Sequence, residues 1–453
     1  MEELIQFELS NEFRGRFHEA VQEKDKKFIV ESLTGVKPAD ISALLEEFDS
    51  EESKYVIDIL AADDRAEIIN GLEPDTREKF LKLFSYEELT SVIISLDSDD
   101  AVDLLNELPL VDRENVIAGL DNDEKEANIL DLLRYDEDVA GGLMAKELIK
   151  ANQNWTVVQC IEEIRRQAES VQKLYSVYVV DDHDILLGRV SLKRIILAND
   201  QTKIADIFES DLASVETFVS EEEVAQLMRK YDLEAVPVVN VQGRLLGRIT
   251  IDDVVDVITE LAEEERNAMA GITEDVEEDD SVWMLTRARL PWLIVGVLGG
   301  FISAKFIGVF EEDLMRITAI AFFIPLIQAT GGNVGIQSSS IVVQSLANPS
   351  AFSDSFFNRL FKVFLVAVLN GLVLSLMVYG FNLLTGGTGN LATVVSTALF
   401  CVVLIASFLG TLTPLILNKF GFNPALASGP FITTLNDLLG LAIYFYTVHL
   451  FLL

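Results

Sequence analysis

Cysteine, histidine and basic residues are scarce in this chain of 453 residues. Cys160 and Cys401 are its only cysteines and lie far apart, so the sequence implies no disulfide framework. The three histidines are scattered over the chain, at His18, His183 and His449. No nucleophile–base pair or phosphate-binding loop stands out either, and we therefore do not expect an enzyme.

Lysine and arginine together number 35, against 73 acidic residues, which gives a net charge of −38. Almost all of this charge precedes Arg287, because only 5 of the acids and 7 of the bases lie from that residue onward. Such an acidic front half repels nucleic acid and attracts cations, although most individual acids only keep the domain soluble. The first residues, Met1–Ser10, are acidic and lack an apolar core, so we expect no cleavable signal peptide.

A large apolar residue recurs every twelve positions in the first third of the chain, at Phe48, Leu60, Leu72, Phe84, Leu96, Leu108 and Leu120. Residues that start helices, namely Asp, Glu, Ser or Pro, follow each of them within four positions. A unit of this length is one short helix and its turn, which cannot bury a core alone but can stack into a solenoid. We predict that residues 36–138 form a small α-superhelix within an acidic domain of residues 1–138.

A strand–turn–strand pattern then occurs twice, over residues 176–180 with 185–190 and over residues 235–239 with 245–250. The second copy, VPVVNVQGRLLGRITIDDVVDVI, closely resembles a CBS domain. The region 139–261 is therefore similar to a tandem CBS pair, an α/β module.

This resemblance implies dimerisation and binding of an adenine nucleotide such as ATP. The ribose contact of CBS domains is a Ser or Thr followed three residues later by Asp, here Thr250 and Asp253. The first copy has Ser191 but carries Arg194 where the Asp would be, so a nucleotide site there is not implied.

An acidic segment, residues 262–286, joins the CBS pair to the remainder of the chain, and we predict that it is a connecting helix. Such a charge run is either a solvated linker or an element that couples the two regions.

Five apolar segments follow, over residues 290–310, 314–346, 360–384, 391–417 and 424–453. Each has about the 20 residues that a helix needs to span a bilayer. We therefore predict a multi-pass membrane domain of residues 287–453.

The basic residues near the ends of these segments predict the orientation of the membrane domain. One side collects Arg287, Arg289, Arg359, Lys362 and Lys419. Positive charge marks the cytoplasmic side, so the amino-terminal half is predicted to be cytoplasmic and the C-terminus to lie outside the cell membrane.

One acid, Asp437, lies deep within an apolar segment. A carboxylate near the middle of a bilayer costs roughly 3 kcal/mol even on a lenient scale, so it should face protein or water. The alternative to a cation site is a protonated carboxyl bonded to a neighbouring helix.

The second apolar segment is predicted to contain a broken helix. Pro325 removes a backbone donor, and the glycines of residues 330–335 allow the hydrogen-bond ladder to open. Asn333, Gln337 and Ser338 would then add neutral oxygen ligands. Alternatively, the small residues serve only close helix packing.

Neutral oxygens with a single carboxylate suit a hard cation that keeps much of its water, which is typical of Mg²⁺. A Zn²⁺ or Cu⁺ carrier would present Cys, His or Met ligands. Here Cys401 stands alone and His449 lies near the end of its segment.

Two motifs, PLIQATGGNVGIQSS and NPALASGPFITTLNDLLGL, resemble the MgtE family of Mg²⁺ channels. The order of an acidic helical domain, a CBS pair, a connecting helix and five membrane helices is similar too. The resemblance implies a homodimer with its pore on the two-fold axis, where Asp437 of each subunit faces the pore and Asn333 lies nearby.

The same resemblance implies that cytoplasmic Mg²⁺ bridges the acidic domains and closes the pore. The residues that match the family's regulatory acids are Asp232, Asp253, Asp256, Glu264 and Glu265, with Glu67, Asp99 and Asp103 in the helical domain. The family often has Asp where this chain has Asn423, so metal bridging at that position is in doubt.

The predicted mechanism is electrostatic. Interfacial carboxylates repel one another, and Mg²⁺ between them favours a compact, closed state. One alternative is a membrane-anchored CBS sensor of nucleotide or metal without transport activity, which leaves Asp437 unexplained. Another is an anion channel, which should present basic residues to its pore. Channel and carrier are not distinguished by the sequence.

Overall fold

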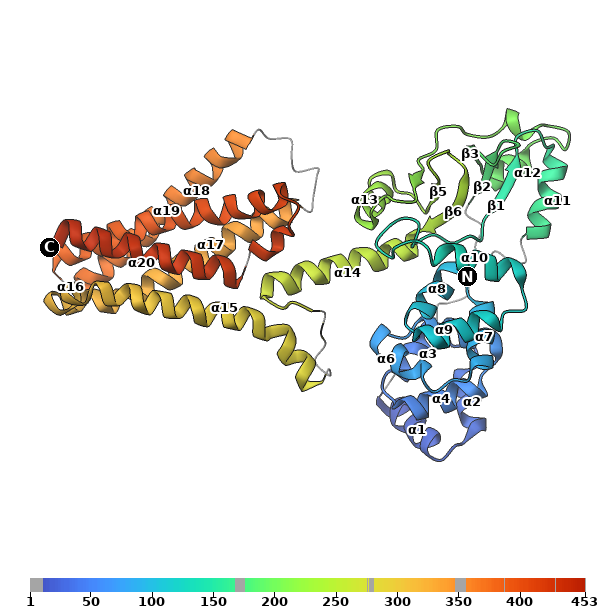
Figure 1. Ribbon diagram of the computed structural model, residues 1–453, viewed down its shortest axis with the longest axis horizontal. Helices are drawn as coiled ribbons and strands as arrows, with labels where there is room; N and C mark the ends of the chain where they lie inside the picture. The colour runs from blue at the N-terminus through green and yellow to red at the C-terminus, as the bar shows by residue number, and fades with distance from the viewer. Residues whose placement is uncertain are drawn as a thin grey trace. The chain divides into compact units, whose positions relative to one another are not determined.

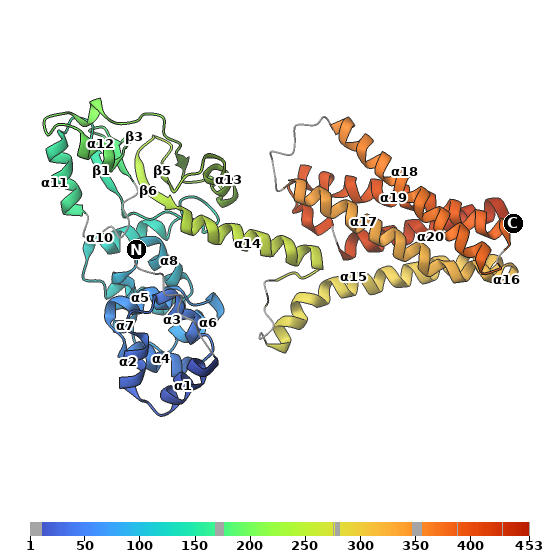
Figure 2. The same cartoon turned by 180° about the vertical axis from the view of Figure 1, so that it is seen from behind.

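The computed structural model describes residues 11–167, 176–274, 276, 281–346, 356–386, 388–427 and 429–452. The chain folds into two compact units, Met1–Ile258 and Thr259–Leu453 (Figures 1 and 2). Each unit has its own fold and is described separately.

The first unit begins with a stack of short helices, as the twelve-residue repeat predicts (Figure 1). The repeating apolar residues lie at the ends of the helices. Leu60 and Leu96 are the C-cap residues of their helices, and Leu72 and Leu108 are each the first residue after a C-cap. Alternate helices pack on each other, for example α3 on α5 and α8 on α10, which confirms the superhelix. The helices are α1 Asn11–Gln22, α2 Lys26–Leu33, α3 Pro38–Leu45, α4 Ser50–Ile59, α5 Ala62–Asn70, α6 Pro74–Leu81, α7 Tyr86–Ser95, α8 Ser98–Asn106, α9 Leu110–Ala118 and α10 Asp123–Leu132.

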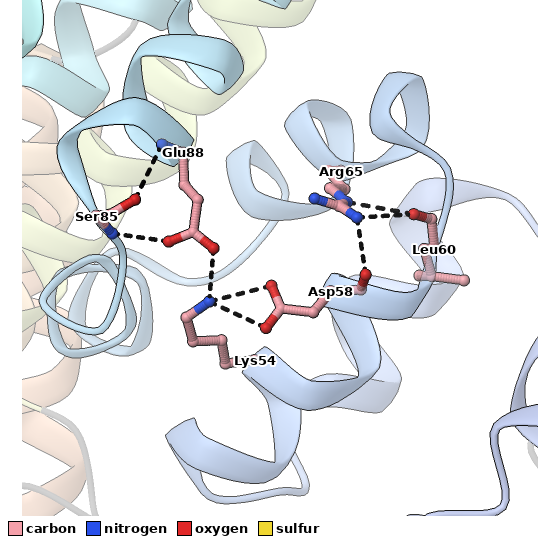
Figure 3. Close-up of polar contacts among 6 residues, drawn as sticks. All are labelled: Lys54, Asp58, Leu60, Arg65, Ser85 and Glu88. Atoms are coloured by element: carbon pink, nitrogen blue, oxygen red, sulfur yellow. Dashed lines mark hydrogen bonds and ion pairs between the residues drawn. The ribbon is translucent and has the colours of Figure 1, made fainter.

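Polar contacts also tie successive repeats together (Figure 3). Lys54 of α4 donates to Asp58 at 3.0 Å and to Glu88 of α7 at 3.1 Å. Glu88 in turn accepts from the backbone N–H of Ser85, whose hydroxyl caps the start of α7. Arg65 of α5 donates to the carbonyl oxygen of Asp58 at 2.8 Å. These bonds fix the spacing between repeats, since the apolar core alone is not directional.

The CBS pair follows in the same unit, as predicted. Each half is a three-stranded sheet in which the first two strands are parallel and the last two antiparallel. The strands are β1 Ile149–Asn152, β2 Val177–Val180 and β3 Leu186–Val190 in the first half, and β4 Val215–Glu216, β5 Ala235–Val239 and β6 Leu245–Thr250 in the second. The accompanying helices are α11 Val157–Gln167, α12 Leu192–Leu197 and α13 Glu221–Tyr231.

Helix α14, Ile251–Ala270, starts in the second CBS half and continues into the second unit without a break. The predicted connecting segment 262–286 is not one helix, because α14 ends at Ala270, where Gly271 takes a left-handed conformation with φ +76°. The acids at 277–280 lie outside the described residues, and the end of the segment, from Val282, belongs to the first long apolar helix.

The second unit contains, among its described residues, five helices long and apolar enough to cross a membrane, as predicted. They are α15 Val282–Val309, α17 Ile324–Leu346, α18 Phe356–Leu384, α19 Gly389–Lys419 and α20 Pro430–Leu452, with the short α16 Glu311–Arg316 between the first two. Helix α19 packs against α17, α18 and α20, and α20 also packs against α15 and α17 (Figure 2). Helix α20, which carries Asp437, is therefore enclosed by three other helices.

The predicted break in the second apolar helix is wrong. Helix α17 runs without interruption through residues 330–335. Pro325 lies in its first turn, where the missing backbone N–H would have no helical partner anyway. The glycines allow close packing instead. A Cβ on Gly335 would lie 1.8 Å from Nδ2 of Asn436, and one on Gly410 would lie 2.4 Å from the Gly335 carbonyl oxygen. The packing alternative is thus the correct one for this motif.

Candidate functional site

Asp437 lies in a cavity within the membrane unit. The cavity has a volume of about 270 Å³ and is lined by Gly296, Gly299, Gly300, Ser303, Ala304 and Ile307 of α15, Gln328 of α17, and Thr434 and Asp437 of α20. Within the described residues no basic side chain pairs with the Asp437 carboxylate. Small residues, Ile307, neutral polar side chains and one acid therefore line the cavity.

Close packing of α15 and α17 on α20 shapes this cavity. A Cβ on Gly299 would lie 2.1 Å from Cγ2 of Thr434, so only glycine lets α15 come so near α20. A Cβ on Gly332 would lie 3.7 Å from Oδ1 of Asp437, which places the carboxylate beside α17 as well. Glycine at these positions leaves room around the acid for water or an ion.

The resemblance implied that Asn333 lies near the pore, and in the structure Asn333 does not line the cavity of Asp437. Asn333 and Gln337 are exposed on α17, while Gln328, one and a half turns earlier, reaches the cavity. The sequence analysis missed Gln328 and Thr434. The sequence did carry a signal for them, since each is a polar residue on the same apolar helix as a candidate site residue: Gln328 with Asn333, and Thr434 with Asp437.

Asn436, the neighbour of Asp437, is 2% exposed, and neither side-chain polar atom has a hydrogen-bond partner within the described residues. Its amide group packs directly against the backbone of Gly335, in the space that a Cβ atom would occupy. Burying an unpaired amide is costly. The α17–α20 contact is therefore held by shape at this point and not by a hydrogen bond.

A second group of candidate residues lies between the helical domain and the CBS pair of the first unit. Asp99 and Asp103 of α8 and Asp253 of α14 influence one another electrostatically. Burial raises the pKa of Asp253 to about 6 and that of Asp103 to about 7, although the Asp103 side chain remains exposed. The pKa of the buried Asp99 is also raised, first by burial and then by Asp100 and Asp253. Burial and the neighbouring acids thus both disfavour the charged forms of these carboxylates.

Cationic side chains border this acidic cluster, which we define as Asp97, Asp99, Asp100, Asp103, Asp252 and Asp253. Lys125 is 9% exposed and pairs with Glu147 at 3.4 Å. Arg248 lies 3.9 Å from Asp97. Among the described residues, no group of three or more His, Cys, Asp or Glu residues is arranged to hold a metal ion. The cluster is therefore acidic but not a preformed metal cage.

The other predicted regulatory acids are not part of the cluster. Glu67 is exposed on α5, and Asp232 is the exposed, left-handed C-cap of α13. Asp256 is exposed on α14, where burial and Asp252 raise its pKa. Glu264 and Glu265 lie further along α14, in the second unit, and burial raises the pKa of Glu265.

Thr250 and Asp253, the predicted ribose contacts, bond to each other. The Asp253 carboxylate accepts from the Thr250 hydroxyl at 2.7 Å and from its backbone N–H at 3.1 Å. A separate cavity of about 240 Å³ in the CBS pair is lined by Tyr178, Arg189, Tyr231, Asp232 and Glu234, among others, but not by Thr250 or Asp253. Arg194, at the variant position of the first copy, pairs with Glu209 at 2.8 Å.

An acidic unit that contains a CBS pair, joined to long apolar helices around an unpaired carboxylate, indicates a membrane transporter or channel for cations. Models of known families match the corresponding parts of the chain. The MgtE intracellular N domain matches residues 36–138, CBS domains match 138–200 and 204–260, and the divalent cation transporter model MgtE matches 324–447.

The chain belongs to the MgtE family of magnesium transporters, which are not enzymes. It is 34% identical over 438 residues to the magnesium transporter MgtE of Thermus thermophilus, which covers 96% of this chain and 97% of that protein. The MgtE of Enterococcus faecalis is 37% identical over 73% of this chain and 72% of its own length.

Solved structures resemble the first unit. The cytosolic domain of the Mg²⁺ channel MgtE in complex with ATP matches with a TM-score of 0.51 and 33% identity, over 54% of this chain and 99% of that one. The soluble part of a magnesium transporter matches with a TM-score of 0.50 and 28% identity, over 55% of this chain and 98% of that one.

Proposed function

We propose that this chain carries Mg²⁺ across the cell membrane past Asp437. The observation that carries the proposal is the unpaired carboxylate in a cavity among membrane-spanning helices. The naming of its relatives as magnesium transporters supports the same ion. A carboxylate at this depth attracts a cation because nothing else nearby neutralises it.

The size and lining of the cavity suit an ion that keeps its water. At about 30 Å³ per water, a cavity of about 270 Å³ takes on the order of nine waters, more than the six that surround octahedral Mg²⁺. Gln328, Ser303 and Thr434 offer neutral oxygens to such waters. Asp437 then acts through the hydration shell, so the ion need not be stripped.

A homodimer would complete the wall of the pathway. Gly296 and Gly300 line the cavity but are exposed on this single chain, and Asn333 is exposed on α17. A second copy over this face would bury the glycines and bring Asn333 to the shared pathway. The distribution of Lys and Arg predicts the orientation, with the first unit in the cytoplasm and the C-terminus outside.

Regulation by cytoplasmic Mg²⁺ would act through the acidic cluster. Mg²⁺ between α8 and α14 would offset the cost that burial and neighbouring acids place on the charged forms of Asp99 and Asp253, and would so favour docking of the helical domain on the CBS pair. ATP is proposed as a second ligand of the CBS pair. The candidate place for it is the cavity at Arg189, whose guanidinium could bind a phosphate although Asp232 and Glu234 also line it, since Thr250 and Asp253 bond to each other.

Complementation tests the proposal. A cell that depends on added Mg²⁺ for growth should be rescued by the full chain but not by Asp437→Ala at equal membrane abundance. Glu311→Gln, an exposed acid outside the cavity, is the matched control and should rescue. Failure of the wild type to rescue, with the protein in the membrane, would favour a CBS sensor without transport.

A further inference from the structure

Asn436 lies on the face of α20 that packs against α17 and α19. Ile432 and Gly440 flank it on this face, one helical turn to either side. Ile432 is fully buried, and a Cβ on Gly440 would lie 3.6 Å both from Cγ2 of Ile327 in α17 and from Cγ1 of Val402 in α19. Asn436 is thus a polar side chain at an otherwise apolar contact between three helices.

The amide of Asn436 fills a notch in α17, which we define as the space over Gly335 where a side chain would begin. A Cβ on Gly335 would lie 1.8 Å from Nδ2 and 3.0 Å from Cγ of Asn436, so the amide and a side chain there cannot share this space. Helix α19 packs on the same turn of α17, because a Cβ on Gly410 would lie 2.4 Å from the Gly335 carbonyl oxygen and 3.0 Å from Cβ of Ser338. The turn that carries the notch is therefore itself fixed by α19.

Asp437 follows Asn436 in the chain but faces another neighbour, because consecutive residues of a helix lie about 100° apart around its axis. A Cβ on Gly332 would lie 3.7 Å from Oδ1 of Asp437, one turn along α17 from the notch at Gly335. Asp437 lines the cavity together with Thr434, whereas Asn436 does not. A rotation of α20 that takes the amide out of the notch therefore also turns the carboxylate away from its place in the cavity.

Within the described residues no hydrogen bond contributes to this fit, since both polar atoms of the buried Asn436 side chain lack a partner. The seating of the amide in the notch thus depends on shape. We propose that Asn436 is a positioning residue, whose side chain fixes the rotation of α20 about its axis and so directs the Asp437 carboxylate at the cation pathway. Asn436 acts on the ion only through Asp437, and this inference rests on the proposed function.

A small rotation of α20 is enough to weaken the hold on the ion. The carboxylate lies roughly 5–6 Å from the helix axis, half the diameter of a helix with its side chains, so a rotation of about 20° moves it by about 2 Å. Such a shift breaks a hydrogen bond between the carboxylate and a water of the ion, because these bonds span only about 2.5–3.0 Å. Losing one hydrogen bond to a charged group weakens binding about tenfold.

The test is the dependence of flux on Mg²⁺ concentration in proteoliposomes that contain the full chain. Asn436→Ala empties the notch and should raise the half-saturating Mg²⁺ concentration about tenfold. Adding Gly335→Ala puts a methyl group into the vacated space and should recover most of that loss. Gly308→Ala is the matched control, because nothing lies within 4 Å of a Cβ there, and it should recover none of the loss when added to Asn436→Ala.

The half-saturating concentration separates positioning from folding, since a merely structural role of Asn436 would lower the amount of folded protein and the maximal flux but not this concentration. An equal half-saturating concentration in the wild type and Asn436→Ala would overturn the positioning role. Equal effects of Gly335→Ala and Gly308→Ala in the Asn436→Ala background would overturn it too, while transport past Asp437 would stand. Absence of flux in the wild type would instead remove the proposed function.

Discussion

Replacing Asp253 with asparagine removes one charge from the acidic cluster and keeps an oxygen that can accept the bonds of Thr250. Burial, and then the charges of neighbouring acids, raise the pKa of Asp253 from 3.8 to about 6. At about 1.4 kcal/mol for each pKa unit, the ionised carboxylate destabilises the folded first unit by up to about 3 kcal/mol. The exposed Asp103 adds little to this free energy because water screens its charge.

The sign of the pH dependence follows from the raised pKa. Between about pH 4 and pH 6 the folded state holds the Asp253 proton more tightly than the unfolded state, so stability falls as the pH rises through this window. Above it the full penalty is present. Asp253→Asn should therefore stabilise the protein at pH 8 without Mg²⁺ and should match the wild type near pH 4.

The assay is thermal unfolding of the full chain in detergent, with and without Mg²⁺. At pH 8 without Mg²⁺, Asp253→Asn should raise the midpoint of the first unit by up to about 10 °C. The further rise caused by Mg²⁺ should shrink, since less repulsion is left to relieve. Asp200→Asn, at an exposed acid, is the control and should change neither value. An unchanged or lower midpoint for Asp253→Asn at pH 8 would refute the destabilising effect of the ionised Asp253 carboxylate.

Two further predictions concern packing and charge. Gly335→Ala should destabilise the membrane unit by about 1–3 kcal/mol or more, because its methyl group would overlap the Asn436 amide. Gly308→Ala should be tolerated, because nothing lies within 4 Å of a Cβ there. The midpoint of unfolding in detergent distinguishes the two variants. Arg77→Ala should cost about 3 kcal/mol, because it leaves the largely buried Glu107 carboxylate without the donor that now lies 2.8 Å away. Adding Glu107→Ala should recover most of that loss in a chemical denaturation series, and no recovery would show that the charge is not the cause.

Much of the fold could be predicted from the sequence because apolar residues recur in regular patterns along the chain. Leu60, Leu72 and Leu96 are spaced by multiples of twelve residues, the length of one helix and one turn, and each lies at or directly after a helix C-cap in the structure. The membrane helices are equally readable, since length and hydropathy alone identify them. Both signals are local in the chain.

The parts that could not be predicted depend on contacts between distant residues. The glycines at 331–335 are compatible with an open helix or with close packing, and only the position of Asn436 on Gly335 decides between the two. Likewise, Asp253 matches a nucleotide contact in sequence, but its neighbours across the fold are Asp99 and Asp100. Sequence spacing does not report such neighbours.

The most direct test of the central claim is Mg²⁺ flux into proteoliposomes that contain the purified chain, with Asp437→Asn as the comparison. The variant keeps the size and polarity of the side chain and removes only its charge. We predict that the wild type conducts and that Asp437→Asn falls to the level of empty vesicles, while the folded fraction of both proteins is equal. Flux through Asp437→Asn equal to that of the wild type would contradict the account.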